Sequence, residues 1–264
     1  MNKIEEITPS VSRTYNLPLV EDCSRLPEAP RFQDNDWKPL PERFLAGIEF
    51  ASRFTAIPVN GPHTNYIAAI HVSDTRAIAT DNKTLVEFDL GGEVAYDMSL
   101  TVQDMRVLRS FGASPSHVGR LDGRDIRLHF RWATGTALAL RPMGRTAPAV
   151  AKSMVTNFDW SDMNPVDAHW RGQIVGQFSI KPVRDTSDLL HVHPDRIESS
   201  TYTDESQVCL PFTTHSPVYT VYDRPQIIRA IKIAERIKFV ERAEGTYFLF
   251  CAEKIRGVLA SMVV

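Results

Sequence analysis

The spacing of apolar residues changes several times along the chain, and each change marks an expected boundary between elements. Residues 41–54 have apolar side chains at helical spacing. These side chains are Phe44, Leu45, Ile48, Ala51 and Phe54. Pro41 and Glu42 suit the first turn of a helix, and the stretch IPVNGPH at 57–63 ends the pattern. The spacing therefore predicts a helix over 41–54.

After residue 64 the apolar period becomes two, which is typical of strands with one buried face. The strand candidates are residues 65–72, 75–81, 83–90 and 93–100. A second helix is expected at 101–112, where Gly112 suits the position just past a helix end. Further strands are expected within 117–132 and at 136–143, with turns at Asp122-Gly123 and Thr134-Gly135.

The second half of the chain repeats much of this order. Its strand candidates are residues 171–180, 189–203, 206–212, 217–222, 245–253 and 255–264. A helix is expected at 223–237, with Asp223 as its N-cap and Pro225 in its first turn. No counterpart of the helix at 41–54 stands out in this half.

Taken together, the pattern predicts an α+β protein with two units of similar element order, at 40–150 and 151–264. Residues 1–39 are rich in Pro, Asp and Glu. They are expected to form an extended N-terminal segment or linker, with one strand candidate at 14–20.

Basic residues recur at helical spacing. Arg229, Lys232 and Arg236 fall at i, i+3 and i+7 of the helix expected at 223–237, so they project from one face. Arg106 and Arg109 are again three apart on the shorter helix. A helix with one apolar and one basic face suits contact with phosphates without reading of bases. An ordinary solvated helix shows the same face, and spacing alone leaves both interpretations open.

Composition narrows the class of protein. A chain of 264 residues and 29.8 kDa suggests two domains. The net charge of −2 argues neither for nor against nucleic acid. The three cysteines are far apart and odd in number, which fits reduced thiols. The N-terminus does not resemble a signal peptide and no long apolar window occurs, so we expect a soluble cytoplasmic protein without a membrane partner.

The hairpin AIATDNKTLVEFDL at 77–90 joins two alternating strands through Thr80-Asp81-Asn82-Lys83. Asp and Asn tolerate left-handed backbone conformations, so they suit a tight turn. This stretch resembles the ATDG-x-x-L hairpin of the bacterial sliding clamps, the β subunits of DNA polymerase III. Asn82 stands where that family usually has Gly, and Asn also accepts a positive φ.

Other stretches resemble the same family in the same order along the chain. Residues 17–30 are similar to the link between its first and middle domains, and 101–112 to the second inward-facing helix of the middle domain. Residues 153–166, with Phe158-Asp159-Trp160, resemble the connector LVDGxFPDWxxVxP. Residues 255–264 resemble the final strand, with Ala260-Ser261-Met262 in place of the usual Met-Pro-Met.

The resemblance implies two copies of the DNA-clamp fold, with antiparallel sheets outside and helices on the inner face. Family chains have three copies and close a ring of six around DNA. This chain resembles them from the last strand of their first domain onward, so a ring would need a homotrimer, as in the clamps of phages and eukaryotes. The implied function is a processivity factor that encircles double-stranded DNA without sequence specificity. It would engage a DNA polymerase and a clamp loader through short linear peptides; the alternative is a clamp-fold interaction module that closes no ring.

The resemblance also implies two sites. Contacts to DNA correspond to Arg43, Arg53, Tyr66, Arg106, Arg109, Arg229, Lys232 and Arg236. A hydrophobic peptide pocket on the outer face between the units corresponds to Ile67, Thr80, Asn82, Lys83, Thr84, Leu85, Met163, Val258, Leu259, Ala260, Ser261 and Met262. A shallow apolar pocket with a polar rim suits an extended peptide with one or two apolar anchors. For Leu85 and Val258, plain packing within the sheet is an equal alternative.

An enzyme is the remaining alternative. His191-Val192-His193 has the spacing that places two imidazoles on one side of a strand, as in metal hydrolases. No further His, Asp or Glu motif completes a metal site, and the sequence has no phosphate-binding glycine motif or G-x-S-x-G nucleophile. Cys209 and Cys251 stand in apolar strand contexts, which is typical of buried thiols. We therefore expect no catalytic residue, no metal and no cofactor.

Overall fold

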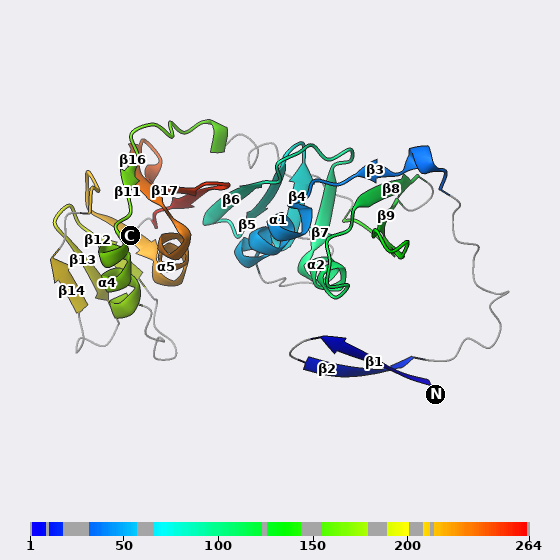
Figure 1. Cartoon of the computed structure of the whole chain (residues 1–264). Coiled ribbons are helices and arrows are strands. Elements are labelled where there is room, and N and C mark those ends of the chain that lie inside the picture. Colours follow the sequence, from blue (N-terminus) through cyan, green and yellow to red (C-terminus); the bar gives the residue numbers. More distant parts are fainter. Residues whose placement is uncertain are drawn as a thin grey trace.

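The structure is a computed structural model of the chain, and it describes residues 2–8, 11–17, 32–56, 66–122, 126–143, 155–178, 189–200, 208–211 and 214–262. Near the N-terminus, β1 (Asn2–Thr8) and β2 (Val11–Leu17) pair as an antiparallel hairpin (Figure 1). The sequence had predicted one strand at 14–20 within a linker, whereas the described part of this segment has two paired strands. A short 3-10 turn, η2 (Asp34–Asp36), and β3 (Lys38–Pro39) follow.

The first succession of elements agrees closely with the apolar pattern. Helix α1 (Phe44–Ala51) continues into the 3-10 turn η3 (Ser52–Phe54), which confirms the helix expected at 41–54. The following elements are η4 (Tyr66–Ala68), β4 (Ala69–Ser73), β5 (Arg76–Thr80), β6 (Thr84–Asp89), β7 (Met98–Thr101), α2 (Val102–Arg109), β8 (His117–Leu121), β9 (Arg127–Arg131) and β10 (Ala137–Leu140). Thr101 caps α2, because its hydroxyl accepts the Asp104 N–H at 3.0 Å.

The second succession corrects the sequence analysis in two places. Its elements are β11 (Asn164–Pro165), α4 (Ala168–Phe178), β12 (Leu189–Val192), β13 (Arg196–Ser200), β14 (Val208–Pro211), β15 (Thr220–Asp223), α5 (Arg224–Ile233), β16 (Arg236–Arg242), β17 (Gly245–Ala252) and β18 (Ile255–Ala260). The strand expected at 171–180 is wrong, because α4 occupies most of it. The helix expected at 223–237 ends early, and β16 begins at Arg236.

Tertiary hydrogen bonds explain why α5 ends at Ile233. The backbone of Ala234 is extended, and its carbonyl oxygen accepts the Arg171 guanidinium at 2.5 Å. The backbone of Glu235 accepts from Val166 and donates to the carbonyl of Cys251, both at 2.8 Å. These partners lie on other elements, so the helical period of the sequence could not signal the break.

The two successions have the same topology. The strands form a central eight-stranded sheet, in the order β11-β16-β17-β18-β6-β5-β4-β7, and two four-stranded sheets, β10-β9-β8-β3 and β14-β13-β12-β15. When the second succession is aligned on the first, β18-β17-β16-β11 corresponds to β10-β9-β8-β3, and β14-β13-β12-β15 to β6-β5-β4-β7. The central sheet is therefore made of one sheet from each succession.

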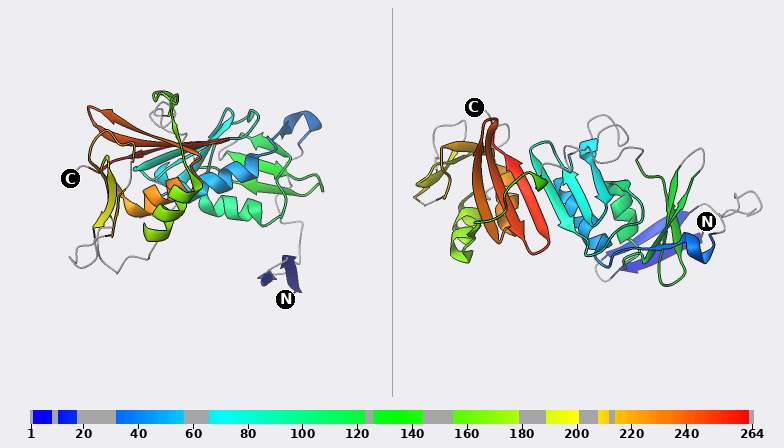
Figure 2. Two further views of the ribbon diagram at one scale, coloured as in Figure 1. Left: turned by 60° about the vertical axis from the view of Figure 1, so that its left-hand side comes forward. Right: turned by 90° about the horizontal axis from the view of Figure 1, so that it is seen from above.

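The two halves of the central sheet meet where β18 pairs with β6, and we call this pairing the seam. It is antiparallel, with Val258 opposite Leu85 and Gly257 opposite Val86. Helices α1, α2, α4 and α5 lie along one face of the sheets, which we call the helix face (Figure 2, left). Their apolar residues and those of the sheet form one large core, which includes Phe44, Ile48, Val86, Leu108, Ile174, Ile231, Phe250 and Leu259.

The opposite, outer face of the seam has a second apolar core. This outer cluster consists of Ile78, Leu85, Val155, Phe158, Met163, Leu249 and Val258. Residues 155–163, which we call the strap, supply Val155, Phe158 and Met163 to it. The strand residues of the cluster alternate with those of the large core, as period-two spacing requires. The strap therefore gives the outer face of the seam an apolar cover.

Candidate functional site

The hairpin between β5 and β6 has the turn chemistry that its sequence predicted. Asn82 adopts a positive φ of 75°, and its N–H donates to the Thr80 hydroxyl at 3.2 Å. The Asp81 carboxylate accepts the N–H groups of Lys83 and Thr84 at 3.1 and 2.7 Å. This side chain thus replaces backbone partners inside the turn.

The turn of this hairpin also forms polar contacts with residues of the second succession of elements. Lys83 Nζ forms an ion pair with Asp223 at 3.0 Å, and Gln226 Nε2 donates to Asp81 Oδ2 at 2.8 Å. The N–H of Ala260 donates to the carbonyl of Lys83 at 2.9 Å. Asp223 is also the N-cap of α5, as predicted, with its carboxylate accepting from Gln226 N. The turn therefore holds the start of α5 and the end of β18 beside the seam.

The structure brings part of the predicted peptide pocket together. Leu85, Met163 and Val258 meet in the outer cluster, where they are 5%, 8% and 1% exposed. They pack closely beneath the strap. Plain packing, the alternative that the sequence left open for Leu85 and Val258, describes their present contacts.

The other predicted pocket residues are not members of the outer cluster. Leu259 is buried in the large core on the helix face, and Thr84 alternates to the same side. Asn82 and Lys83 are exposed, whereas Ile67, Thr80, Ala260, Ser261 and Met262 are half-buried. The N–H of Met262 donates to Val221 at 2.8 Å, so the chain beyond β18 runs along β15. The structure therefore brings together only three of the residues predicted for the pocket, namely Leu85, Met163 and Val258.

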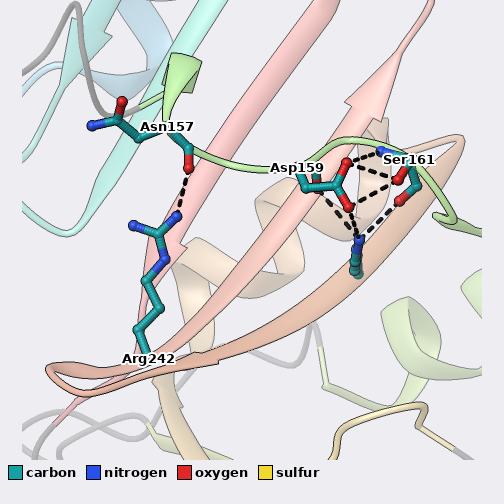
Figure 3. A network of polar contacts seen from close by, with 5 residues as sticks. Asn157, Asp159, Ser161 and Arg242 are labelled. Carbon is teal, nitrogen blue, oxygen red and sulfur yellow. Dashed lines mark hydrogen bonds and ion pairs between the residues drawn. The ribbon is translucent and has the colours of Figure 1, made fainter.

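Polar contacts hold the strap in place (Figure 3). The Asp159 carboxylate accepts the backbone N–H of Ser161 at 2.9 Å, its hydroxyl at 2.7 Å, and Lys238 Nζ at 3.1 Å. The bonds from Ser161 and Lys238 hold the pKa of Asp159 at about 2. Arg242 donates to the carbonyl of Asn157 at 2.7 Å, and its guanidinium lies 3.8 Å from the centre of the Phe158 ring. Two residues of β16, Lys238 and Arg242, thus hold the strap at Asp159 and at Asn157.

A hollow of about 220 Å³, missed by the sequence analysis, lies beside the outer cluster on the same face of the seam. Thr75, Arg76, Glu87, Asp89, Ala252, Glu253, Lys254, Ile255 and Arg256 line it. Glu87 is 6% exposed and pairs with Arg76 at 2.9 Å. Burial raises the pKa of Glu87, and the guanidinium groups of Arg76 and Arg256 oppose that rise. The sequence signal for this hollow was the presence of charged residues at outward-facing positions of β6 and β18. These residues come together only because the two strands pair with each other.

On the helix face, several of the predicted DNA-binding cations are exposed. Arg106 and Arg109 project from α2, Lys232 from α5 and Arg53 from η3. Arg109 forms an ion pair with Glu49 at 2.9 Å. These four cations are therefore exposed to solvent, and the charge of Arg109 is partly compensated by Glu49.

The remaining predicted cations have other surroundings. Arg229 donates to the carbonyl of Arg53 at 2.6 Å and lies 5.5 Å from the centre of the Phe54 ring, so it links α5 to η3. Arg43 is half-buried next to Gly91. The prediction that Arg236 projects from the basic face of α5 is wrong. Arg236 belongs to β16, where it is opposite Cys251 and lies on the outer face. The side chain of Tyr66 lies outside the described residues.

Comparisons with known proteins agree with this architecture. No family model matches the sequence, and a search of curated proteins finds no significant match. Among solved structures, the β subunit of DNA polymerase from Streptococcus pyogenes matches with a TM-score of 0.65 and 14% identity, over 99% of this chain and 74% of that chain. The Caulobacter crescentus β sliding clamp matches with a TM-score of 0.67 and 15% identity over the same shares. The chain has the fold of the bacterial sliding clamps.

The likeness extends to a clamp with a bound ligand. The Helicobacter pylori β clamp bound to a DNA ligase peptide matches with a TM-score of 0.65 and 10% identity, over 99% of this chain and 74% of that one. At such identities the likeness concerns the clamp fold, and it confirms the α+β architecture with two copies of that fold. The structural resemblance inferred from the hairpin and connector is thereby confirmed.

The enzyme alternative gains no support from the described residues. His191 Nδ1 lies 2.7 Å from the Tyr219 hydroxyl, and His193 Nε2 lies 3.5 Å from Glu198 Oε2. Within the described ranges, no group of three or more His, Cys, Asp or Glu residues could hold a metal ion. In the same ranges, no helix is long and apolar enough to cross a membrane.

Proposed function

We propose that this protein is a DNA sliding clamp, a processivity factor that encircles duplex DNA without sequence specificity. In this proposal it tethers a polymerase, and is engaged by a clamp loader, through short linear peptides at its outer face. The observation that carries the proposal is the placement of α1, α2, α4 and α5 on one face of the sheets, with Arg106, Arg109 and Lys232 exposed on these helices. Such a face suits a duplex held by its phosphates. The site of action would be the nucleoid in the cytoplasm.

The topology supports a specific mode of ring closure. In the repeated order, β14 is the counterpart of β6 and β10 is the counterpart of β18. Pairing of β14 in one copy with β10 in the next would therefore reproduce the seam between copies. The interface is heterologous, and three copies with units at 40–150 and 151–264 would close a ring of six.

The edge strand β10 is suited to such pairing. It reads Ala-Leu-Ala-Leu, and its Leu138 and Leu140 are half-buried at the margin of the large core. Edge strands that avoid association usually have charged residues or proline. Ala139→Lys places a charge on this edge, whereas Thr134→Lys adds the same charge in the adjacent turn and serves as its control.

DNA contact in this proposal involves Arg53, Arg106, Arg109 and Lys232, together with Arg43, Tyr66 and Arg229. The binding is expected to weaken steeply with salt, because released counterions drive it. Peptide partners would bind on the outer face beside the strap-covered outer cluster, in contact with Asn82, Lys83, Ala260, Ser261 and Met262. The β clamps of similar fold include one bound to a DNA ligase peptide, which supports a peptide site of this kind.

The decisive experiment combines molar mass with topology-dependent retention on DNA. Light scattering at several concentrations should give a mass near three times 29.8 kDa. The assembly should stay on nicked circular DNA and leave it after linearisation. Ala139→Lys should lower both the mass and the retention, and Thr134→Lys should change neither. Equal retention on circular and linear DNA would contradict encirclement.

A clamp-fold interaction module without a ring is the second candidate. It is favoured by the compensated cations of the helix face, since Arg109 pairs with Glu49 and Arg229 binds the carbonyl of Arg53. A persistent monomer that still binds a peptide at the outer face would support this module and contradict the ring.

A further inference from the structure

The hollow next to the outer cluster, which we call the seam pocket, combines a buried acid with cations from both sides of the seam. Glu87 and Arg256 are directly opposite each other on β6 and β18, and Arg76 lies beside Glu87 on β5. Lys254 comes from the turn between β17 and β18. The pocket is therefore complete only when the two halves of the central sheet are joined.

Arg256 is the cation in this pocket with the most unused hydrogen-bonding capacity. Its ion pair with Glu87 has an N–O distance of 4.0 Å, which is too long for a hydrogen bond. Among the described residues it has no closer polar partner, and its side chain is 52% exposed. Its guanidinium lies over the Trp160 ring, 5.6 Å from the ring centre, at cation–π distance. A planar guanidinium with free donors suits a carboxylate, which it can bind through two parallel bonds.

The acids that line the pocket have partners of their own. Glu87 accepts from Arg76 at 2.9 Å, and Asp89 accepts the N–H of Gly91 at the same distance. Glu253 pairs with Lys254 at 3.6 Å. Each acid thus has a local hydrogen-bond or ion-pair partner, and Arg256 is the cation of the lining whose donors are least used.

The pocket continues the surface over which a partner peptide would lie. Along β6, Glu87 follows Leu85 by two residues, and along β18, Arg256 precedes Val258 by two, a step of about 7 Å in either strand. Trp160 contacts both regions, since it packs against the outer cluster and lies beneath Arg256. An extended peptide whose apolar side chain packs against the strap-covered cluster would therefore bring its second-next residue to the seam pocket.

We propose that the seam pocket binds the carboxylate of an acidic side chain in a partner peptide, with Arg256 as its direct ligand. This inference rests on the proposed peptide-binding function of the outer face. It adds a rule for the partner: an Asp or Glu stands two residues from the apolar anchor.

The test uses the full chain labelled with 15N-arginine, and follows the Nε–Hε signal of Arg256 in NMR titrations. The signal is assigned by its loss in Arg256→Gln. The probes are the capped peptides Gly-Leu-Ser-Glu-Gly, its Gln and Lys analogues, and inorganic phosphate. We expect the Glu peptide to bind about tenfold more tightly than the Gln peptide, as charge-assisted paired bonds allow.

Variants separate this site from general charge effects. Arg256→Gln should abolish the preference for Glu, and Arg256→Lys should retain part of it, because lysine keeps the charge without the paired donors. Arg120→Gln removes a distant arginine that pairs with Asp122, and it should leave the preference intact. Thermal melting of each variant checks that the seam is still formed.

Each other outcome overturns the inference in a recognisable way. Equal binding of the Glu and Gln peptides would overturn the seam pocket and leave the peptide-binding function standing. Tighter binding of the Lys analogue, or phosphate binding as strong as that of the Glu peptide, would also overturn it. Binding by none of the peptides would overturn both the pocket and the peptide site on which it rests.

Discussion

Gly257 in β18 provides a direct test of how tightly the seam is packed. It pairs with Phe250 on one side and Val86 on the other, and it is buried. A Cβ atom at this position would overlap the Phe250 ring, lying 2.5 Å from Cε1 and closer still to Cε2 and Cζ. Phe250 is fully buried within the large core, so any shift of its ring must displace other core side chains. The absent side chain at Gly257 thus makes room for this ring.

The expected cost of Gly257→Ala follows from this geometry. Insertion of a methyl group into a filled core costs about 1–3 kcal/mol, and complete loss of the packing of a phenylalanine costs about 3–5 kcal/mol. Because the ring must be displaced, we expect a loss of about 2–4 kcal/mol in the free energy of unfolding. In a chain of this size that corresponds to a fall in Tm of roughly 5–15 °C.

Urea denaturation followed by circular dichroism and thermal scans measures this loss. Gly176→Ala is the matched control, since a Cβ there meets nothing within 4 Å and the site is helical. It should raise stability by about 0.5–1 kcal/mol, as Gly is a poor helix residue. In Phe250→Leu, addition of Gly257→Ala should cost much less than in the wild type. A Gly257→Ala protein within about 0.5 kcal/mol of wild type, the usual range for unstrained sites, would refute the packing argument.

Three further predictions concern the two faces and the strap. Lys232→Ala should lower the slope of log affinity for duplex DNA against log salt concentration by about one. Arg236→Ala should leave this slope unchanged, because Arg236 lies on the outer face. Equal effects of the two substitutions would contradict the assignment of faces. Asp223→Ala removes the N-cap of α5 and the ion pair to Lys83, and should cost about 1–2 kcal/mol in urea denaturation, while Asp223→Asn retains the cap and costs less. Because the pKa of Asp159 is lowered from 3.8 to about 2, its stabilisation of the strap is complete above pH 3.8 and is lost as the pH falls through 2. Hydrogen exchange of the strap amides should become faster over this pH range. If the same pH dependence persisted in Asp159→Asn, another titrating group would be responsible for it.

Local chemistry was readable from the sequence because it depends on neighbours along the chain. The positive φ of Asn82, the turn bonds of Asp81 and the N-cap role of Asp223 all arise within three residues. The apolar stripe of α1 and the alternation of β4 to β6 were equally visible, because each element presents one face to the core. The resemblance of the hairpin and connector then indicated the clamp fold.

The sequence analysis was wrong in two places, once because a short local pattern was ambiguous and once because distant contacts overrode it. The residues of α4 are apolar at Trp170, Ile174 and Phe178, a helical spacing, but the short run at 171–180 also suits a strand. The end of α5 depends on Arg171 and on the backbone of Val166 and Cys251. That break moves Arg236 from the helix face to the outer face.

The sequence by itself thus determined the turns, the caps, most helices and strands, and the order of elements that marks the clamp fold. The tertiary structure decided that Leu85, Met163 and Val258 close into an outer cluster, and that Glu87 and Arg256 share a pocket. Both features depend on the pairing of β6 with β18, strands that are far apart along the chain. No period or turn signal specifies such a pairing, because its register is set by the packing of two complete halves of a sheet.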